Sequence, residues 1–544
     1  MTELPEHPHL DHLRKQAKDL LRGYKTSDAT ALARLRAGLP GAAGKDDAVL
    51  AALGLRLHDA QSCIAREYGF ASWADLKFSI EARVAARGGR EAATLAFLRL
   101  VYAGDIAGTV DRARPAVAAR MLSDNPDLAA GDPYLACAVG DQSALRQATM
   151  NDPGWVNRPG GPLKLPPLAA VTHSGLLRLP DFRPRLHACA RDLLEAGADP
   201  NQRIGSRWTP ASLAEPSEEW QLSALYGAAG QNFDAELTAV LLRAGADPND
   251  NESLYHALEN FDCTRMLLEA GARVTGSNAM YRVMDLDHVA ALRLLLAHGG
   301  DPNEPAAGPP TSDWGRPLLW AIRRRRSPEH IEALLQSGAD SQARTPDGVS
   351  AWRLALQFGL AEVAELLRQA GGAEPVSDEE QFIAACSRGD AAEARRLRAL
   401  RPDLPGALAQ RQLKLLPELA AEGCADAVRL MVELGWPIAV RGGDWDASAL
   451  NHAVFRGDAA LARFLLEHDA SWTEPHGFGD NACGTLAWAS YNEPVEGGDW
   501  VGCAEVLVAH GMRPEPDPER PGCVRVGGRR KLFSDEVTEF LLGV

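Results

Sequence analysis

The stretch LLEAGADPN, at residues 193–201, returns almost unchanged as LLRAGADPN at residues 241–249. Its two leucines end an amphipathic helix, and the glycine that follows can take the left-handed backbone that stops a helix without steric cost. Weaker copies are LLEAGARVT, LLLAHGGDPN, LLQSGADSQ, MVELGWPIAV, LLEHDASWT and VLVAHGMRPE. A phrase that recurs through a long chain indicates an array of similar units.

Glycine fills the stop position in most copies of this phrase. The stop residues are Gly197, Gly245, Gly271, Gly299, Gly338, Gly435, Asp469 and Gly511, with a displaced copy near Gly371. Asp469 fits among the glycines, because Asp enters the left-handed region more readily than most residues. Neighbouring stops lie 26 to 48 residues apart, and the 64-residue gap between Gly371 and Gly435 would hold two units. A degenerate repeat therefore explains the chain better than a set of unrelated domains.

A second, shorter helix is expected upstream of each stop. Its copies are SALYGAA at 223–229, ESLYHAL at 252–258, RPLLWAI at 316–322, SALNHAV at 448–454 and GTLAWAS at 484–490. With these phrases the chain resembles the ankyrin-repeat family, whose unit pairs a helix beginning T-P-L-H-x-A with a helix ending A-G-A-D-x-N. The resemblance covers residues 132–514, in about eleven irregular units, and residues 91–131 are a candidate for a further degenerate unit. It implies an all-α ankyrin-repeat solenoid of helix pairs with β-hairpin-like fingers.

The two ends of the chain lie outside this repeat. Residues 1–84 carry helical patterns but no repeat phrase, and a solenoid needs its apolar ends covered, so a small helical N-terminal cap domain is expected. Similar segments precede ankyrin arrays in bacterial proteins, a resemblance that implies no activity. Residues 515–544 predict a C-terminal cap, with a hairpin turning at Gly527–Gly528 and a helix capped by Ser534.

Residues 57–80, LHDAQSCIAREYGFASWADLKFSI, invite comparison with a helix-turn-helix, because a Gly-containing turn separates two short helices. DNA binding through these helices is disfavoured, since Asp59, Glu67 and Asp75 would face the phosphate backbone. The formal net charge of −16 opposes nucleic-acid binding by the whole chain as well.

The composition narrows the class of protein further. The 544 residues contain no apolar run of about eighteen residues, and the N-terminus lacks the apolar core of a secretory signal, so a cytoplasmic protein without a membrane span is expected. Nine Cys are scattered singly without a C-x-x-C pair, which favours neither a disulfide framework nor a zinc ribbon. No metal and no cofactor are expected. The run Arg323–Arg326 is typical of a solvated loop between two helices.

The segment GGDWDASALNHAV, residues 442–454, has the composition of either a small acid/base site or a turn before a helix. Asp444, Asp446 and His452 could serve catalysis, but no third group is spaced to orient His452 as a base. Because the segment follows a helix stop, it is predicted to be the β-hairpin finger between two units. We then expect Trp445 at an exposed turn tip, both carboxylates in solvent, and no histidine within hydrogen-bond reach of either.

The fingers carry the candidate partner-binding residues. Trp is scarce in polar turns and common at the centre of protein interfaces, and acidic neighbours suit a partner rich in Lys or Arg. The candidates are Trp208, Trp220, Asp313, Trp314, Asp444, Trp445, Asp446, Trp472 and Asp480. The sequence therefore predicts a non-catalytic interaction scaffold that binds a protein partner through the concave face and finger loops of the solenoid.

An enzyme or a small-molecule-sequestering protein is the alternative. Its support is the long loop 202–220, which could cover a pocket, and the polar set His173, His187 and His256. No H-E-x-x-H, G-x-S-x-G or P-loop motif occurs, so no catalytic residue is assigned. A preformed apolar pocket with convergent polar groups would favour this alternative.

Overall fold

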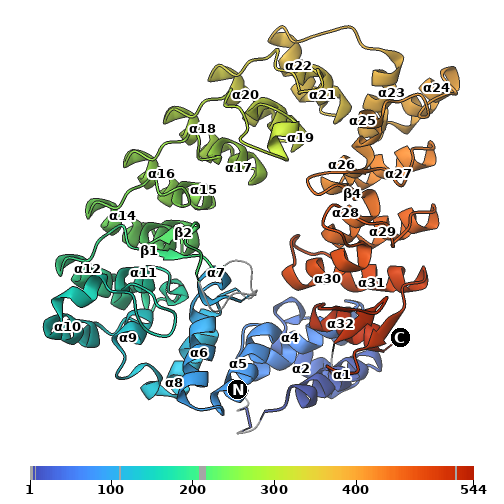
Figure 1. Cartoon of the computed structure of the whole chain (residues 1–544). Coiled ribbons are helices and arrows are strands. Elements are labelled where there is room, and N and C mark those ends of the chain that lie inside the picture. Colours follow the sequence, from blue (N-terminus) through green and yellow to red (C-terminus); the bar gives the residue numbers. More distant parts are fainter. Residues whose placement is uncertain (1–3, 6–7, 110–111, 208–215, 521–522, 544) are drawn as a thin grey trace. The chain divides into compact units, whose positions relative to one another are not determined.

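The computed structural model shows how the repeated phrases build pairs of helices that stack on one another (Figure 1). It describes residues 4–5, 8–109, 112–207, 216–520 and 523–543. The chain divides into two compact units, Met1–Ala279 and Met280–Val544. None of the described helices is long and apolar enough to cross a membrane.

The first unit begins with helices that enclose a core of their own. They are α1 (Leu10–Lys25), α2 (Ala29–Gly38), α3 (Asp47–Ala51), α4 (Leu57–Glu67) and α5 (Trp73–Ala86). Leu13 and Ile64 are buried in this core, and the Tyr24 hydroxyl donates hydrogen bonds to the carbonyl oxygens of Leu50 and Ala51. The role of this region as a cap of the array remains a prediction.

The rest of the first unit consists of short helices and one small hairpin. The helices are α6 (Arg90–Val101), α7 (Gly104–Ala107), α8 (Pro115–Asp124), α9 (Pro133–Val139), α10 (Gln142–Asn151), α11 (Pro167–Thr172), α12 (Arg183–Glu195), α13 (Ala224–Tyr226), α14 (Ala235–Arg243), α15 (Ser253–Ala257) and α16 (Phe261–Glu269). Strands β1 (Arg203–Gly205) and β2 (Gln221–Ser223) pair antiparallel ahead of α13. Helix α17 (Ala279–Asp285) begins at the boundary between the units.

The second unit continues the same arrangement. Its helices are α18 (Val289–Ala297), α19 (Pro317–Arg323), α20 (Pro328–Gln336), α21 (Ala351–Gln357), α22 (Ala361–Gln369), α23 (Asp378–Ser387), α24 (Ala391–Leu400), α25 (Gln410–Leu413), α26 (Leu415–Ala421), α27 (Ala425–Glu433), α28 (Ala449–Arg456), α29 (Ala459–Glu467), α30 (Ala482–Asn492), α31 (Trp500–Ala509) and α32 (Asp535–Leu542). Leucines of the second helix in a pair, such as Leu334 of α20 and Leu465 of α29, are fully buried. Burial of this apolar stripe is what holds the stack together.

The LLEAGADPN phrase acts where successive helix pairs join. From Gly197 to Gly511 the stop glycines have φ angles between 85° and 97°, and Asp469 takes the same left-handed conformation at 70°. The last residue of the phrase links one pair to the next, because the Asn201 amide donates to Gly245 O at 3.3 Å while its oxygen accepts from Asp247 N at 2.7 Å. The same two bonds recur from Asn157 to Gly197 and Asp199, from Asn249 to Gly271 and Arg273, and from Asn303 to Gly338 and Asp340.

A β-hairpin finger lies between α27 and α28, as the sequence predicted. Strands β3 (Arg441–Gly442) and β4 (Ala447–Ser448) pair antiparallel, with Arg441 opposite Ser448. Ser448 then caps α28, because its hydroxyl accepts a hydrogen bond from the backbone N–H of Asn451. The loop reading of the GGDWD segment is therefore confirmed.

The C-terminal segment forms a small sheet followed by a helix. Strands β5 (Pro514–Pro516), β6 (Val524–Val526) and β7 (Arg529–Lys531) pair in that order. The turn between β6 and β7 uses the left-handed residues Gly527 and Gly528, with φ 57° and 76°. The Ser534 hydroxyl accepts from Val537 N and caps α32.

Candidate interaction site

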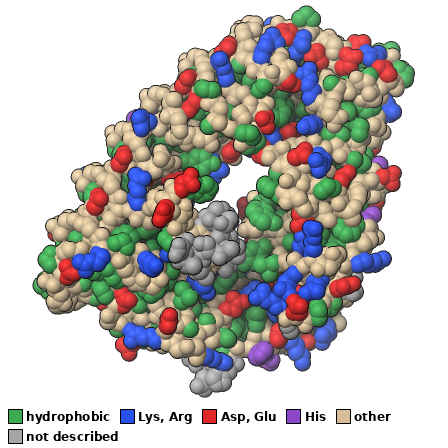
Figure 2. Space-filling model, viewed as in Figure 1, with side chains coloured by type: hydrophobic (Ala, Val, Ile, Leu, Met, Phe, Trp, Pro, Cys, Tyr) green, Lys and Arg blue, Asp and Glu red, His purple; other side chains and the backbone are tan. Residues whose placement is uncertain are grey.

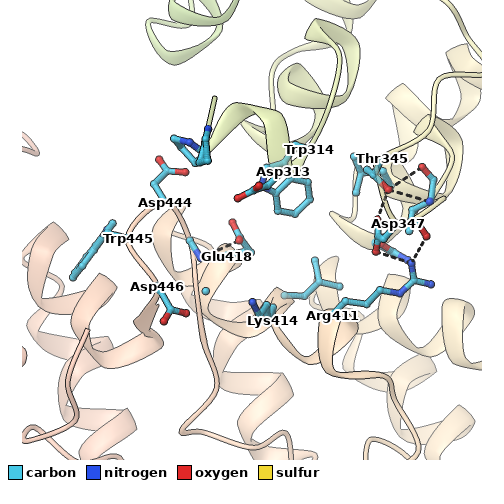
Figure 3. Close-up of a pocket in the computed structure, with 18 of the residues that line it drawn as sticks. Asp313, Trp314, Thr345, Asp347, Arg411, Lys414, Glu418, Asp444, Trp445 and Asp446 are labelled. Atoms are coloured by element: carbon cyan, nitrogen blue, oxygen red, sulfur yellow. Dashed lines mark hydrogen bonds and ion pairs between the residues drawn. The ribbon is translucent and has the colours of Figure 1, made fainter. Parts of the chain in front are cut away.

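A cleft of about 730 Å³ in the second unit brings together five of the predicted finger residues (Figure 3). Its walls come from the loop before α19, the turn at residues 345–349, α25 and α26, the β3–β4 hairpin, and Gly477 with Phe478. Segments more than one hundred residues apart in the sequence therefore share one surface. The five predicted residues are Asp313, Trp314, Asp444, Trp445 and Asp446.

Trp314 and Asp313 form the wall that precedes α19. Trp314 is half-buried, with its ring 4.8 Å from the Arg323 guanidinium and 5.9 Å, edge-on, from the ring of Phe358. Asp313 is exposed, and its carboxylate has no hydrogen bond or ion pair within the described parts of the chain. This wall thus offers an aromatic ring held in place and a carboxylate with nothing bound to it.

Asp444 is exposed, as expected, but its carboxylate is held in two ion pairs that the sequence did not indicate. Its Oδ1 lies 2.6 Å from Nη1 of Arg323, and its Oδ2 lies 2.6 Å from Nη2 of Arg324. Burial alone would raise the pKa of Asp444, but the two guanidinium charges outweigh burial and hold it below its ordinary value. Local sequence could not show this contact, because the partners are about 120 residues apart and meet only through the curvature of the stack.

The run Arg323–Arg326 is also not the solvated loop that was expected. The Arg323 side chain is only 2% exposed, and it binds Glu418 Oε2 at 2.8 Å. Arg324 pairs with Asp285 at 2.9 Å besides Asp444, and these carboxylates raise its pKa although burial acts in the opposite direction. Arg325 donates to the carbonyl oxygen of Phe358, and Arg326 lies 3.1 Å from Asp287. These four cations are internal braces of the fold.

Glu418 connects this ion network to the hairpin. One of its oxygens accepts from Arg323, and the other accepts from the backbone N–H of Gly443 at 2.9 Å. Its side chain is 7% exposed. A buried carboxylate with three donors is satisfied at both oxygens, so Glu418 fixes the hairpin against α26 and α19. No local pattern indicates this role, since Glu418 lies within an ordinary helical pattern.

Trp445 is not the bare turn tip that was expected. It is half-buried in an aromatic cluster, with its ring 4.8 Å from His452, 5.0 Å from His476 and 5.9 Å from Phe455. The loop around residue 477 covers it, because Gly477 N donates to Trp445 O at 3.0 Å. Truncating Trp445 would therefore disturb packing as well as any partner contact.

Phe478 is the most exposed aromatic residue of the cleft and was missed from the sequence. Its side chain is 80% exposed, and its ring stacks on Trp445 at 6.4 Å with an angle of 15° between the planes. The signal that could have found it is the flanking GFG triplet, in which a large apolar residue stands at a glycine turn. Phe478 shares the cleft with Trp314 and Trp445, so its exposed ring belongs to a group of aromatic side chains on one surface.

Asp446 and His452 have structural roles. Asp446 adopts a positive φ of 47° and pairs with Arg441 at 2.8 Å. His452 Nε2 lies 3.2 Å from Gly442 O, and burial lowers the pKa of the ring to about 4. Within the described ranges no histidine hydrogen-bonds Asp444 or Asp446, and none of the His, Cys, Asp and Glu groups there could hold a metal ion. The arrangement is that of a braced finger.

Trp220, Trp472 and Asp480 do not line the cleft. Trp208 lies outside the residues that the structure describes. Trp220 is 62% exposed just before β2 of the first unit. Trp472 is half-buried in the second unit, and Asp480 pairs with Lys531. Among the described candidates, the cleft therefore gathers those from Asp313 to Asp446 but not Trp220, Trp472 or Asp480.

Of the three histidines of the alternative hypothesis, His173 and His187 are buried in the first unit, whereas His256 is half-buried and lies 3.3 Å from Glu252. His173 is fully buried between Gln231 and the Ser223 carbonyl, and burial lowers its pKa. His187 is buried beside Asp234, with 2.8 Å between Nε2 and Oδ2. Part of the loop 202–220 lies outside the described residues. A pocket beneath it remains a prediction.

Comparisons with known proteins found likenesses among solved structures. No family model matches the sequence, and no curated protein matches it either. Among solved structures, the chain is similar to the crystal structure of the human ASB11 ankyrin repeat domain, at 20% identity and a TM-score of 0.32, over 45% of this chain and 100% of that one. The fold is carried by the helix pairs, stop glycines and Asn links described above, and it is the ankyrin-like fold that the two repeated phrases indicate.

Proposed function

We propose that the protein is a non-catalytic scaffold that binds a protein partner through the cleft of its second unit. The supporting observation is the convergence of Trp314, Trp445 and Phe478 with exposed carboxylates on one cleft of about 730 Å³. Aromatic residues dominate the energetics of protein interfaces because they bury a large face at a low entropic cost. Ankyrin-like folds commonly serve as such scaffolds.

The partner-facing part of this site is separate from the part that holds the fold. Phe478 and Asp313 are exposed, whereas Arg323 and Glu418 are buried. The cleft is therefore preorganised by an internal ion network, and a partner need not order the hairpin on binding. Residues suited to testing the proposal are the exposed ones.

The test is affinity purification from the source cell, followed by titration of each recovered protein against the pure full-length chain. Phe478→Ala should weaken the partner's binding by about 2 kcal/mol, or roughly thirtyfold, if the ring is a hot spot. Leu400→Ala is the matched control, because Leu400 is 66% exposed in the same unit and does not line the cleft.

Both substitutions should leave the melting temperature nearly unchanged, since exposed positions shift stability by about 0.5 kcal/mol or less. A partner whose affinity is the same for wild type, Phe478→Ala and Leu400→Ala would refute the cleft as the binding site. Recovery of small metabolites alone would support the sequestering alternative.

A further inference from the structure

We infer that the partner segment seated in the cleft carries an arginine whose guanidinium stacks on the Phe478–Trp445 pair and meets Asp313. This inference rests on the proposed function and names the chemistry of its partner. The ring of Phe478 lies 6.4 Å from that of Trp445, with 15° between the planes, and 80% of the Phe478 side chain is exposed. A flat cation fits the face of such a ring, because the ring quadrupole attracts positive charge.

One carboxylate of the cleft is left without an internal partner. Five carboxylates and the cationic side chains Arg411 and Lys414 line the cleft, and Arg323, Arg324 and Arg441 pair with three of these carboxylates from outside the lining. Most of these carboxylates already have internal partners, as in the Arg411–Asp347 pair at 2.7 Å, whereas Asp313 has none in the described chain. Figure 3 shows Asp313 beside Trp314 on the side that faces Glu418 and the hairpin. Asp313 is thus the carboxylate available to a visiting cation.

The protein itself shows how this wall holds a guanidinium. Arg323 stands 4.8 Å from the centre of the Trp314 ring while it binds Asp444 and Glu418. Stacking on an aromatic face combined with forked bonds to carboxylates is a geometry that Arg satisfies and Lys does not. The cleft therefore has the components of a second site of the same kind, with Phe478 as the ring and Asp313 as the carboxylate.

Lys414 allows a test of whether charge governs binding in the cleft. It lines the cleft, is exposed, and has no ion pair within the described ranges. A positive side chain there repels an incoming cation, so its removal should strengthen binding. Asp313→Asn should weaken binding, because it removes the attracting charge and keeps the shape. Opposite effects from two neighbouring residues are the signature of charge recognition.

The experiment titrates the full-length protein with labelled short peptides of alternating serine and arginine, and with matched lysine, citrulline, glutamate and leucine peptides. Citrulline keeps the planar shape of arginine without its charge. The arginine peptide should bind tightest, and about tenfold tighter than the citrulline peptide. Phe478→Ala should cost about tenfold, Asp313→Asn about threefold, and Lys414→Ala should gain about threefold. The differences in affinity among these peptides and variants should become smaller at high salt, because salt screens charges.

Leu400→Ala and the melting temperature of each variant serve as controls for folding. Failure of the arginine peptide to bind, or equal binding of the arginine and citrulline peptides, overturns the inference. Binding of the leucine or glutamate peptide that is lost in Phe478→Ala overturns the inference but keeps the proposed function. If neither peptide binding nor the binding of a purified partner changes in Phe478→Ala, both the inference and the proposed function are refuted.

Discussion

Arg323→Met should destabilise the second unit strongly, because it leaves the buried carboxylate of Glu418 without a positively charged partner. The Arg323 side chain is 2% exposed, and its partner Glu418 is 7% exposed. Breaking a buried pair by removing one member typically costs about 3–5 kcal/mol, well above the 1 kcal/mol or less of an exposed pair. The loss of contact between Arg323 and the rings of Trp314 and Trp320 adds to this cost.

A double-mutant cycle separates the ion pair from the packing. Glu418→Gln keeps an oxygen that can accept from Gly443 N but removes the charge. Glu418→Gln alone should cost about 1.5–3 kcal/mol, because a hydrogen bond to a charged group is lost. In the double variant Arg323→Met, Glu418→Gln no charge is stranded at position 418, so the total should fall below the sum of the two single effects by about 2 kcal/mol.

The assay is urea denaturation followed by tryptophan fluorescence, with urea chosen because it does not screen charges. The matched control is the cycle Arg368→Met with Glu365→Gln, an i,i+3 pair on α22 with side chains 55% and 48% exposed. Figure 2 shows acidic and basic side chains near one another over much of the visible surface, and pairs of that exposed kind should contribute little. The Arg323–Glu418 ion pair does not stabilise the fold as described if Arg323→Met lowers the free energy of unfolding no more than Arg368→Met does. The same holds if the effects of the substitutions at positions 323 and 418 simply add.

Three further expectations concern the finger and the links between helix pairs. Burial holds the pKa of His452 at about 4, against an ordinary 6.5. As the pH falls between these values, the unfolded chain binds a proton that the folded chain does not, so the free energy of unfolding should drop by up to about 3 kcal/mol. Most of this drop should be absent in His452→Gln. Parallel unfolding curves for the two proteins from pH 7 to pH 4 would contradict it. Asn201→Ala removes the two bonds to Gly245 O and Asp247 N and should cost about 1–2 kcal/mol by calorimetry, whereas Gln147→Ala, an exposed change on α10, should cost less than about 0.5 kcal/mol; equal melting temperatures would show that the link is incidental. Asp469→Gly should raise the melting temperature slightly, because glycine adopts a φ of 70° without strain. Gly511→Ala is the counterpart that should lower the melting temperature. A lower melting temperature for Asp469→Gly would mean that Asp469 has a stabilising contact of its own.

The repeat could be read from the sequence because its signals are local. A stop such as Gly245 needs a left-handed backbone, and Ser448 needs to cap a helix, whatever the rest of the chain does. These requirements gave the helix pairs, the hairpin finger and the ankyrin-like fold. The Asn201 link has a local cause too, but its meaning appears only when the partner Gly245 is seen one unit away.

The site was predictable only in its parts. Aromatic and acidic residues in the fingers indicated Asp313, Trp314, Asp444, Trp445 and Asp446, and the structure brings them to one cleft. Their states of pairing were not predictable, because the contact of Arg323 with Asp444 depends on the curvature of the stack over 121 residues. The burial of Trp445 depends in turn on how the loop at Gly477 lies against it. Curvature and loop packing are sums over many weak contacts, which no single motif encodes.

The Arg323–Glu418 pair limits how this part of the chain can vary in length. In an ordinary solenoid each repeat touches only its neighbours, so a repeat can be gained or lost and the ends simply shift. Here α19 and α26 are joined directly, with α20 to α25 between them. Gain or loss of one helix pair would displace Arg323 from Glu418 by about 8–10 Å, the spacing of packed helices, and leave both charges stranded. The number of helix pairs between α19 and α26 is therefore fixed by this one ion pair.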